Sequence, residues 1–440
     1  MRTPSDLIHR HIEDVALERI KDTPVLLLEG PRTVGKSTLL RTLAEHTGGR
    51  LVDLDDLDTR TAAIRDPATI IGGPKPLLID EYQHAPMLLD AIKAQLNRDG
   101  NPGQFILTGS ARHESLPRTA QALTGRLQRL PVLPLAQAEL DRTRPRLLER
   151  ALTLPHTLVT PAQSSTSREE YIQRVVRGGL PLALASRTDH ARHVWIDDYV
   201  KLTLERDVQE LSRLRQARVL PDLLARLAGQ TPGVLNATSL AGPVGIDEKT
   251  ARDYIRLLEA VFLVHLLPAW DRTLTKRTTV RPKIHLVDTA VASRLLRLTA
   301  EKLARREAAA MREFGHLLET FVVNELLREA SWSGPVADAG HWRTKDGYEV
   351  DLVIEADDGG VVGFEIKSAA QAAGNDFRGL ERLRDLLGSA FVAGFVLYTG
   401  VRSYTYGDRL HVLPIDRLWT REEVSSTQPD KLAEDLVREG

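Results

Sequence analysis

The sequence predicts an α/β fold in which the first part of the chain forms a parallel sheet covered by helices. Two observations predict it: short runs alternate with helical segments between positions 25 and about 135, and these runs are apolar along their whole length. Strands buried on both faces have this pattern. From about position 312 the order helix, strands, helix, strands predicts a second α/β unit. The strands expected in the first unit are Val25–Leu28, Leu51–Leu54, Leu77–Ile79, Phe105–Leu107 and Leu130–Leu133.

The composition is that of an ordinary globular chain of about two to four domains. Of the 440 residues, 42% are hydrophobic and 27% are charged, and the formal net charge is -1. The absence of cysteine excludes disulfides, thiolate zinc sites and cysteine nucleophiles. No stretch approaches the ~20 apolar residues that cross a bilayer, and the amino terminus lacks an apolar signal-peptide core. We therefore expect a cytoplasmic protein with no membrane partner.

Changes of pattern along the chain suggest four parts. A run rich in Pro, Ser and Thr at 155–168 has the composition of a linker. The expected parts are the first α/β domain at 1–150, a linker and helical region at 151–215, a winged-helix-like region at 216–295 and the second α/β domain at 300–425.

A glycine-rich loop, G-P-R-T-V-G-K-S, joins the first expected strand to a helical pattern. This is the spacing and the context of a phosphate-binding P-loop. Gly30 and Gly35 let backbone N–H groups point at an anion, and the next helix adds the positive end of its dipole. Lys36 would reach the β- and γ-phosphates, and the Ser37 hydroxyl would ligate Mg²⁺. The alternative is a glycine-rich turn before an ordinary helix. The predicted nucleotide-binding residues are Gly30, Pro31, Arg32, Thr33, Val34, Gly35, Lys36, Ser37 and Thr38.

Two further strands end in polar residues that suit this site. Asp80 follows the apolar run L-L-I and would hold Mg²⁺, while the adjacent Glu81 would orient and deprotonate the attacking water. The alternative is an acidic turn. Thr108 and Ser110 end the strand F-I-L, where they would sense the γ-phosphate or position the water. Their alternative role is to cap the next helix.

Arg126, in L-T-G-R, is the candidate arginine finger that would stabilise charge on the transferring phosphoryl group. A surface ion pair is the alternative. If this arginine acts on a neighbouring copy of the chain, ATP turnover requires a homo-oligomer.

The combination of GPRTVGKS, LLIDE, FILTGS and LTGR resembles a prokaryotic family of AAA-like P-loop ATPases, and it is similar to archaeal-type and signal-transduction ATPases. The segment YVKLTLERDV at 199–208 looks typical of that family's middle region. The resemblance extends over most of the chain and ends in a domain of unknown function. It implies an AAA-like fold for the first domain and ATP and Mg²⁺ as cofactors.

The middle of the chain has the pattern of a helix-turn-helix with a wing. Helical segments at 219–228, 237–241 and 247–255 precede an apolar strand at 262–267. A basic run follows, consisting of Arg272, Lys276, Arg277, Arg281 and Lys283. Such cations would contact DNA phosphates without reading sequence. The alternatives are a helical bundle packed under the ATPase and a solvated charged loop.

A second group of charged residues lies near the carboxyl end. Asp351 and Glu365 fall on two expected strands, Lys367 shares a face with Glu365, and Glu319 interrupts the apolar stripe of a helix. The order of these four residues resembles the PD-(D/E)xK nucleases, which have a restriction-endonuclease-like α/β fold. The resemblance implies that Glu319, Asp351 and Glu365 hold a metal and that Lys367 activates water. The alternative is a degenerate site whose charges form a buried salt-bridge network.

Three functions remain open on the sequence. The first is an Mg²⁺-dependent ATPase coupled to a nuclease-like, DNA-interacting carboxyl-terminal region. The second is an ATP-dependent regulatory switch whose last domain binds protein or nucleic acid without cutting it. The third is an interaction protein that binds ATP and barely hydrolyses it.

Overall fold

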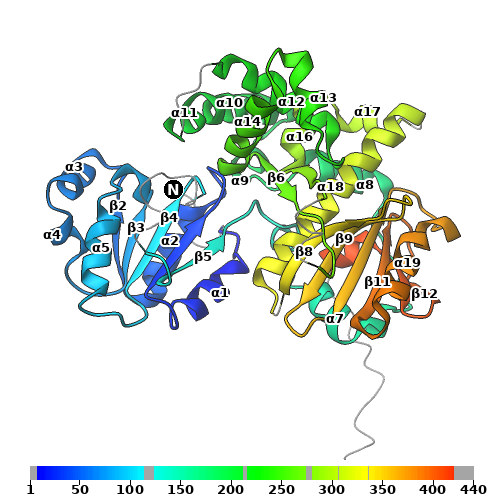
Figure 1. Cartoon of the computed structure of the whole chain (residues 1–440), viewed down its shortest axis with the longest axis horizontal. Coiled ribbons are helices and arrows are strands. Elements are labelled where there is room, and N and C mark those ends of the chain that lie inside the picture. Colours follow the sequence, from blue (N-terminus) through cyan, green and yellow to red (C-terminus); the bar gives the residue numbers. More distant parts are fainter. Residues whose placement is uncertain are drawn as a thin grey trace, which may run out of the picture.

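The computed structural model describes residues 7–112, 123–211, 216–273, 280–305, 307–334 and 336–420. The described chain has three parts (Figure 1). A first sheet with its helices occupies one side, a group of helices lies above, and a second sheet lies on the other side. No helix among these residues is long and apolar enough to cross a bilayer.

The first sheet has five strands in the order β2-β3-β4-β1-β5, and every neighbouring pair is parallel. This confirms the predicted parallel sheet. Alternate residues of β1 enter different cores: Leu26 and Leu28 pack with α1 and α2, whereas Val25 and Leu27 pack with α5. Burial on both faces explains why the strand is apolar throughout. The elements are α1 (Ile12–Arg19), β1 (Val25–Glu29), α2 (Lys36–Thr47), β2 (Arg50–Asp53), α3 (Leu57–Arg65), α4 (Pro67–Ile71), β3 (Leu77–Asp80), α5 (Leu88–Leu96), β4 (Phe105–Gly109), β5 (Leu127–Pro131) and α6 (Gln137–Leu140).

The middle part is helical, apart from the antiparallel pair β6–β7. The expected segment 237–241 is longer in the structure, because the helix continues past Gly242 and includes Pro243. The winged-helix assignment stays a prediction, and Lys276 and Arg277 of the expected basic run lie outside the described residues. The elements are α8 (Arg168–Arg177), α9 (Pro181–Leu184), α10 (Asp189–Leu202), η5 (Thr203–Asp207), α11 (Val208–Leu211), α12 (Leu220–Gln230), α13 (Ala237–Val244), α14 (Glu248–Ala260), β6 (Val264–Leu267), β7 (Lys283–Leu286), α16 (Thr289–Leu295) and α17 (Ala300–Ala304).

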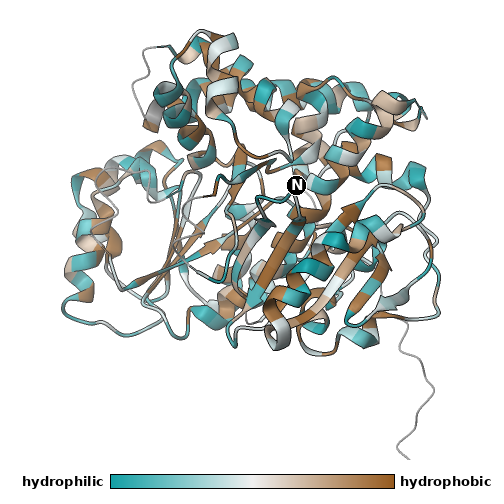
Figure 2. Ribbon diagram, turned by 45° about the vertical axis from the view of Figure 1, so that its right-hand side comes forward, coloured by the Kyte–Doolittle hydropathy of each residue, from teal (hydrophilic) through white to brown (hydrophobic). Residues whose placement is uncertain are grey.

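The second sheet is mixed, with six strands in the order β12-β13-β11-β10-β9-β8. The long helix α18 packs on one face and α19 on the other, since Leu352 and Ile354 of β9 share a core with α18 while Val353 shares one with α19. Apolar residues are concentrated in the inner strands β9, β10, β11 and β13, and strands of this sheet are coloured brown in Figure 2. The elements are α18 (Ala308–Trp332), β8 (Val336–Arg343), β9 (Glu349–Ala356), β10 (Val361–Lys367), α19 (Arg378–Leu387), β11 (Phe391–Tyr398), β12 (Tyr404–Gly407) and β13 (Leu410–Pro414).

The segment between the first sheet and the helical part lies against the second sheet. Helix α7 (Leu147–Thr153) contacts β10 and β11 (Figure 1). In the expected linker, the hydroxyls of Ser164 and Thr166 donate to Oδ2 of Asp416 at 2.5 and 2.9 Å. This stretch therefore holds the carboxyl-terminal module to the rest of the chain, which its composition did not indicate.

Candidate nucleotide-binding site

The predicted P-loop lies between the carboxyl end of β1 and the first turn of α2. Its backbone conformation requires glycine at two positions. Gly35 has a left-handed φ of 97° directly before α2. A Cβ on Gly30 would lie 2.0 Å from the carbonyl oxygen of Val132, because the chain leaving β5 passes close to the loop. The spacing of the two glycines thus follows from the path of the backbone.

Lys36 points into the loop rather than into solvent. Its residue is 4% exposed, and its Nζ donates to the carbonyl oxygens of Gly30 at 2.9 Å and Pro31 at 2.7 Å. Burial lowers the pKa of Lys36 to about 8, against the opposing charge of Glu81. Both of these hydrogen bonds go to neutral carbonyls, so negatively charged phosphate oxygens would be stronger partners.

Arg10, which sequence reasoning missed, supports the loop from the amino-terminal segment. Its guanidinium donates to the carbonyl of Val34 at 2.7 Å, to that of Leu133 at 2.7 Å and to Oε1 of Glu139 at 3.0 Å. One side chain therefore ties the P-loop to the segment after β5. Only the fold brings these positions together, and nothing in the local sequence signals the contact.

Asp80 and Thr108 meet at the same edge of the sheet, because β3 pairs with β4. Thr108 is fully buried, and its hydroxyl donates to Oδ1 of Asp80 and accepts from the backbone N–H of Glu81 at 2.9 Å. The hydroxyl therefore joins the two acidic residues instead of capping a helix. Asp80 is 5% exposed and offers the oxygen ligand that Mg²⁺ prefers.

Glu81 is held by a side chain that the sequence did not single out. The amide of Gln83 donates to Oε2 of Glu81 and, at 3.0 Å, to the hydroxyl of Ser110. Glu81 also has a left-handed φ of 52°, which is uncommon outside glycine. Ser110 thus contributes to the orientation of Glu81 through Gln83.

Arg126 lies away from this edge. It donates from Nη1 to Oδ1 of Asn97 at 2.7 Å on the surface. The next residue, Leu127, starts β5 opposite Val25 at the amino end of β1, whereas the P-loop follows the carboxyl end. Five strand residues at ~3.3 Å each separate them. Arg126 therefore does not reach the P-loop of its own chain, and its action on a neighbouring copy stays a prediction.

The helical part touches the edge of the sheet that carries the P-loop. Nε of Arg32 lies 2.7 Å from both carboxylate oxygens of Asp207, and Pro31 lines the same small cavity as Tyr199 and Asp288. After β4, the backbone N–H of Arg112 donates to the carbonyl of Ala260 in α14 at 2.9 Å. Two loops of the site are thus in direct contact with the middle of the chain.

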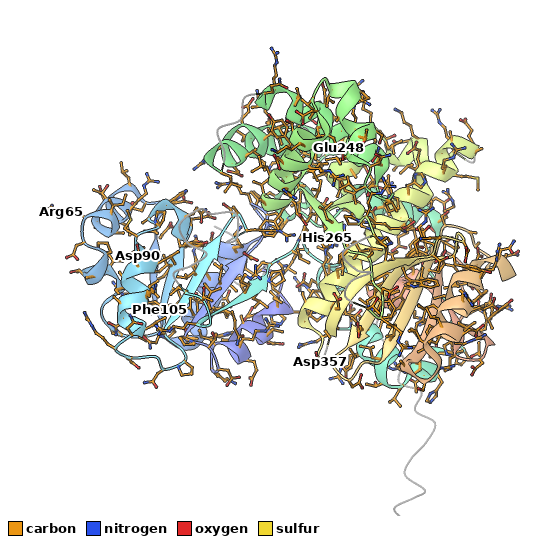
Figure 3. All side chains as sticks on the ribbon, in the orientation of Figure 1. Arg65, Asp90, Phe105, Glu248, His265 and Asp357 are labelled. Carbon is orange, nitrogen blue, oxygen red and sulfur yellow. The ribbon has the colours of Figure 1, made fainter. Side chains whose placement is uncertain are left out.

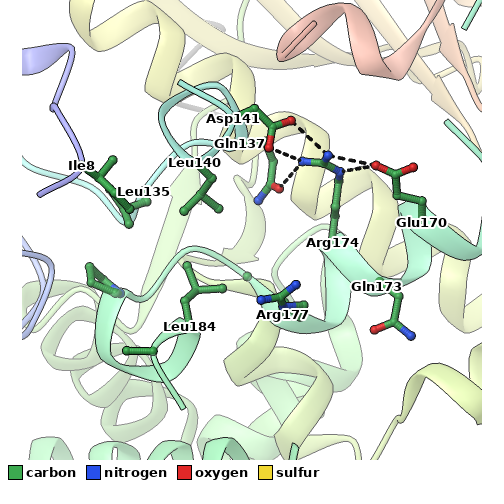
Figure 4. Close-up of a pocket in the computed structure, with 13 residues that line it drawn as sticks. Ile8, Leu135, Gln137, Leu140, Asp141, Glu170, Gln173, Arg174, Arg177 and Leu184 are labelled. Atoms are coloured by element: carbon green, nitrogen blue, oxygen red, sulfur yellow. Dashed lines mark hydrogen bonds and ion pairs between the residues drawn. The ribbon is translucent and has the colours of Figure 1, made fainter. Parts of the chain in front are cut away.

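A cleft of about 500 Å³ lies between α6 and helices α8 and α9 (Figure 4). Arg174 crosses it and pairs with Asp141 at 3.0 Å and Glu170 at 2.9 Å, close to Gln137. The residues that line it include none from the P-loop. This cleft is therefore separate from the phosphate-binding loop, whose carbonyl oxygens accept hydrogen bonds from Lys36.

The carboxyl-terminal charged group contains a cation that was expected elsewhere. Lys283 was assigned to a DNA-contacting wing, and this was wrong: it begins β7, and its side chain is 4% exposed. Its Nζ lies 2.8 Å from Glu319, 2.9 Å from Asp351 and 2.7 Å from Glu349. Burial of Asp351 disfavours its charged form, but the Lys283 ammonium contributes to an overall lowering of the pKa of Asp351. The arrangement is a buried salt-bridge network.

Glu365 and Lys367 form a second pair beside this network. Nζ of Lys367 lies 2.7 Å from Oε1 of Glu365, and burial together with the charge of Asp351 raises the pKa of Glu365 to about 8. Within the part of the chain that the structure describes, no group of three or more His, Asp or Glu side chains is arranged to hold a metal. The metal-binding role expected for Glu319, Asp351 and Glu365 remains a prediction.

Family comparisons agree with the geometry of the first domain. Residues 22–141 match the model of an AAA domain, which covers the P-loop and the acidic strand end. Residues 168–302 and 314–418 match two domains of unknown function, DUF8612 and DUF4143. The chain therefore carries an AAA-type ATPase domain followed by two domains to which no function is assigned.

The chain is also similar over most of its length to two mycobacterial proteins. Uncharacterized protein Rv2008c of Mycobacterium tuberculosis and uncharacterized protein Mb2031c of Mycobacterium bovis are each 26% identical over 421 residues, covering 95% of this chain and 86% of theirs. Among solved structures, the Walker-type ATPase PABY2304 of Pyrococcus abyssi matches 67% of this chain and 97% of its own at 18% identity and a TM-score of 0.40. The Thermotoga maritima RuvB Holliday junction branch migration motor matches 68% and 98% at 17% identity and a TM-score of 0.28.

Proposed function

We propose that this protein binds ATP at the loop Gly30–Thr38 and hydrolyses it with Mg²⁺. The observation that carries the proposal is geometric: the P-loop follows β1, Asp80 ends β3 and Glu81 comes next, so all three lie at the carboxyl end of one parallel sheet. The charges of the two carboxylates also raise the pKa of Lys36, against the larger lowering by burial. The AAA domain match supports the same site.

Each residue has a role that follows from its chemistry. Lys36 exchanges the carbonyls of Gly30 and Pro31 for phosphate oxygens. The Ser37 hydroxyl and the Asp80 carboxylate are the oxygen donors that would hold Mg²⁺, which neutralises phosphate charge when bound. Glu81 accepts a proton from the attacking water, since it is the carboxylate next to the expected metal ligand.

For the carboxyl-terminal module we propose a non-catalytic binding role, so that the whole protein is an ATP-dependent switch. Lys283 supports this choice over cleavage. Its ammonium lies among Glu319, Asp351 and Glu349, where a nuclease would need a divalent cation. A fixed lysine offsets part of the carboxylates' charge but offers no open coordination position for water or phosphate.

Two assays test the proposal. Steady-state ATP hydrolysis with Mg²⁺ should be lost in Lys36→Ala and in Glu81→Gln, and Glu81→Gln should still bind ATP. Lys21→Ala, which removes a surface pair with Glu18, is the control and should hydrolyse ATP at the wild-type rate. Undiminished turnover in both site variants would contradict the ATPase proposal. Separately, plasmid or oligonucleotide DNA should stay intact with Mg²⁺ or Mn²⁺; cleavage that disappears in Asp351→Asn would overturn the non-catalytic assignment.

A further inference from the structure

An ion pair joins the P-loop to the helical part of the molecule. Arg32 is the third residue of the loop, and its Nε lies 2.7 Å from both Oδ1 and Oδ2 of Asp207. The aspartate side chain is 6% exposed and the arginine side chain 24% exposed. Pairs this short and this shielded are screened little by solvent, so the contact restrains both segments.

Asp207 belongs to an irregular turn. Residues Thr203–Asp207 form a π-helical turn between α10 and α11. π-Helical turns are rare and occur frequently at functional sites. The preceding helix α10 carries the buried Tyr199, which lines the same small cavity as Pro31 of the loop. The irregular turn therefore contacts the P-loop through Asp207, and the helix before it borders a cavity next to the loop.

Both cations of the loop are engaged inside the protein. Lys36 is bound to loop carbonyls, and Arg32 is bound to Asp207. A triphosphate entering the loop brings several negative charges next to this guanidinium. The phosphates and the Asp207 carboxylate are like charges that compete for one cation, and in a shielded site that competition has a large effect.

We propose that Arg32 is a second cation for the nucleotide phosphates, that Asp207 holds it back in the empty site, and that nucleotide binding breaks the pair and releases the turn at Thr203–Asp207. This inference rests on the proposed function, because it requires ATP in the loop. It adds a phosphate-binding residue and a route by which the occupied site changes the helical part.

The test is calorimetric binding of a non-hydrolysable ATP analogue with Mg²⁺ to the full-length protein. Asp207→Asn keeps the shape but removes the competing charge, so the analogue should bind about tenfold more tightly, a coupling of ordinary size. Arg32→Gln should bind it more weakly. In Arg32→Gln/Asp207→Asn the gain should vanish, because the aspartate acts through the arginine. Asp197→Asn is the matched control: it breaks a bidentate pair with Arg294 in the same helical part but leaves the Arg32–Asp207 pair intact, so it should bind like the wild type.

Hydrogen exchange on the wild-type protein gives a second readout that needs no variant. The analogue should increase amide exchange in residues 203–211 relative to the empty protein. Wild-type or weaker binding by Asp207→Asn, an equal gain in the Arg32→Gln background, or unchanged exchange at 203–211 would each overturn the inference. If the wild type binds no nucleotide at all, the proposed function fails instead, so the two failures are distinct.

Discussion

Replacing Lys283 with methionine should destabilise the carboxyl-terminal module strongly. Methionine keeps much of the side-chain volume but leaves three carboxylates without the ammonium that lies 2.7–2.9 Å from them. Removing one partner from a buried ion pair costs about 3–5 kcal/mol. Of the three, Glu349 is 33% exposed and can be hydrated, whereas Asp351 is 8% exposed. We therefore expect a loss of about 3 kcal/mol, the lower end of that range, mainly from Asp351.

Urea unfolding at pH 8 measures this loss. Lys21→Met is the control, because its pair with Glu18 has side chains that are 64% and 70% exposed, and its effect should stay within about 0.5 kcal/mol. Adding Asp351→Asn to Lys283→Met should recover part of the stability, since it removes the uncompensated charge. A loss below about 1 kcal/mol in Lys283→Met would refute the view that this lysine balances the cluster.

Three further predictions concern single side chains. Thr108→Val removes the hydroxyl that links Asp80 to the backbone of Glu81. Unfolding assays should show a loss of about 1–3 kcal/mol in stability, and turnover assays should show slower ATP hydrolysis. Unchanged turnover would contradict the positioning role. Burial, with the charge of Lys283, lowers the pKa of His341 to about 4, below its usual 6.5. Between pH 6.5 and pH 4 the folded state therefore binds fewer protons than the unfolded state. The free energy of unfolding should fall by about 3 kcal/mol as the pH drops from 6.5 to 4. Unfolding measured across this range should show a smaller fall in His341→Asn. Arg126→Ala should leave the affinity for an ATP analogue unchanged in calorimetry, because the side chain lies near the amino ends of the strands and the P-loop follows the carboxyl end of β1. Weaker binding by dilute, monomeric protein would contradict this placement.

The histidine belongs to a junction between the helical part and the second sheet. His265 of β6 faces His285 of β7, and the backbone N–H of Trp270 donates to the carbonyl of His341 in β8 at 2.7 Å; the label of His265 marks this junction in Figure 3. Burial lowers the pKa of His265 to about 4 as well. Acidification would therefore place positive charge at this junction from more than one ring, which makes it the region we expect to loosen first.

Local patterns were enough to predict the first domain because each signal depends on near neighbours. An apolar strand, a loop with glycines at fixed spacing and a helix specify a P-loop from one continuous segment. The acidic pair Asp80–Glu81 was found in the same way, since it directly follows its strand. Thr108 was predicted to lie at the same edge, but its link to both acidic residues depends on the pairing of β3 with β4.

The sequence by itself determined where the parallel sheet, the phosphate loop and the charged residues of the last module lie along the chain. The reason is that the periodicity of apolar residues and the residue types of turns are features of short continuous segments. Only the tertiary structure decided which charges neutralise one another. Lys283 looked like part of a basic loop and is the buried counter-ion of three carboxylates 36 to 68 positions away along the chain, while Arg32 pairs with a residue 175 positions away. Electrostatic partners are set by distance in space and by the exclusion of water, and neither is encoded in sequence spacing.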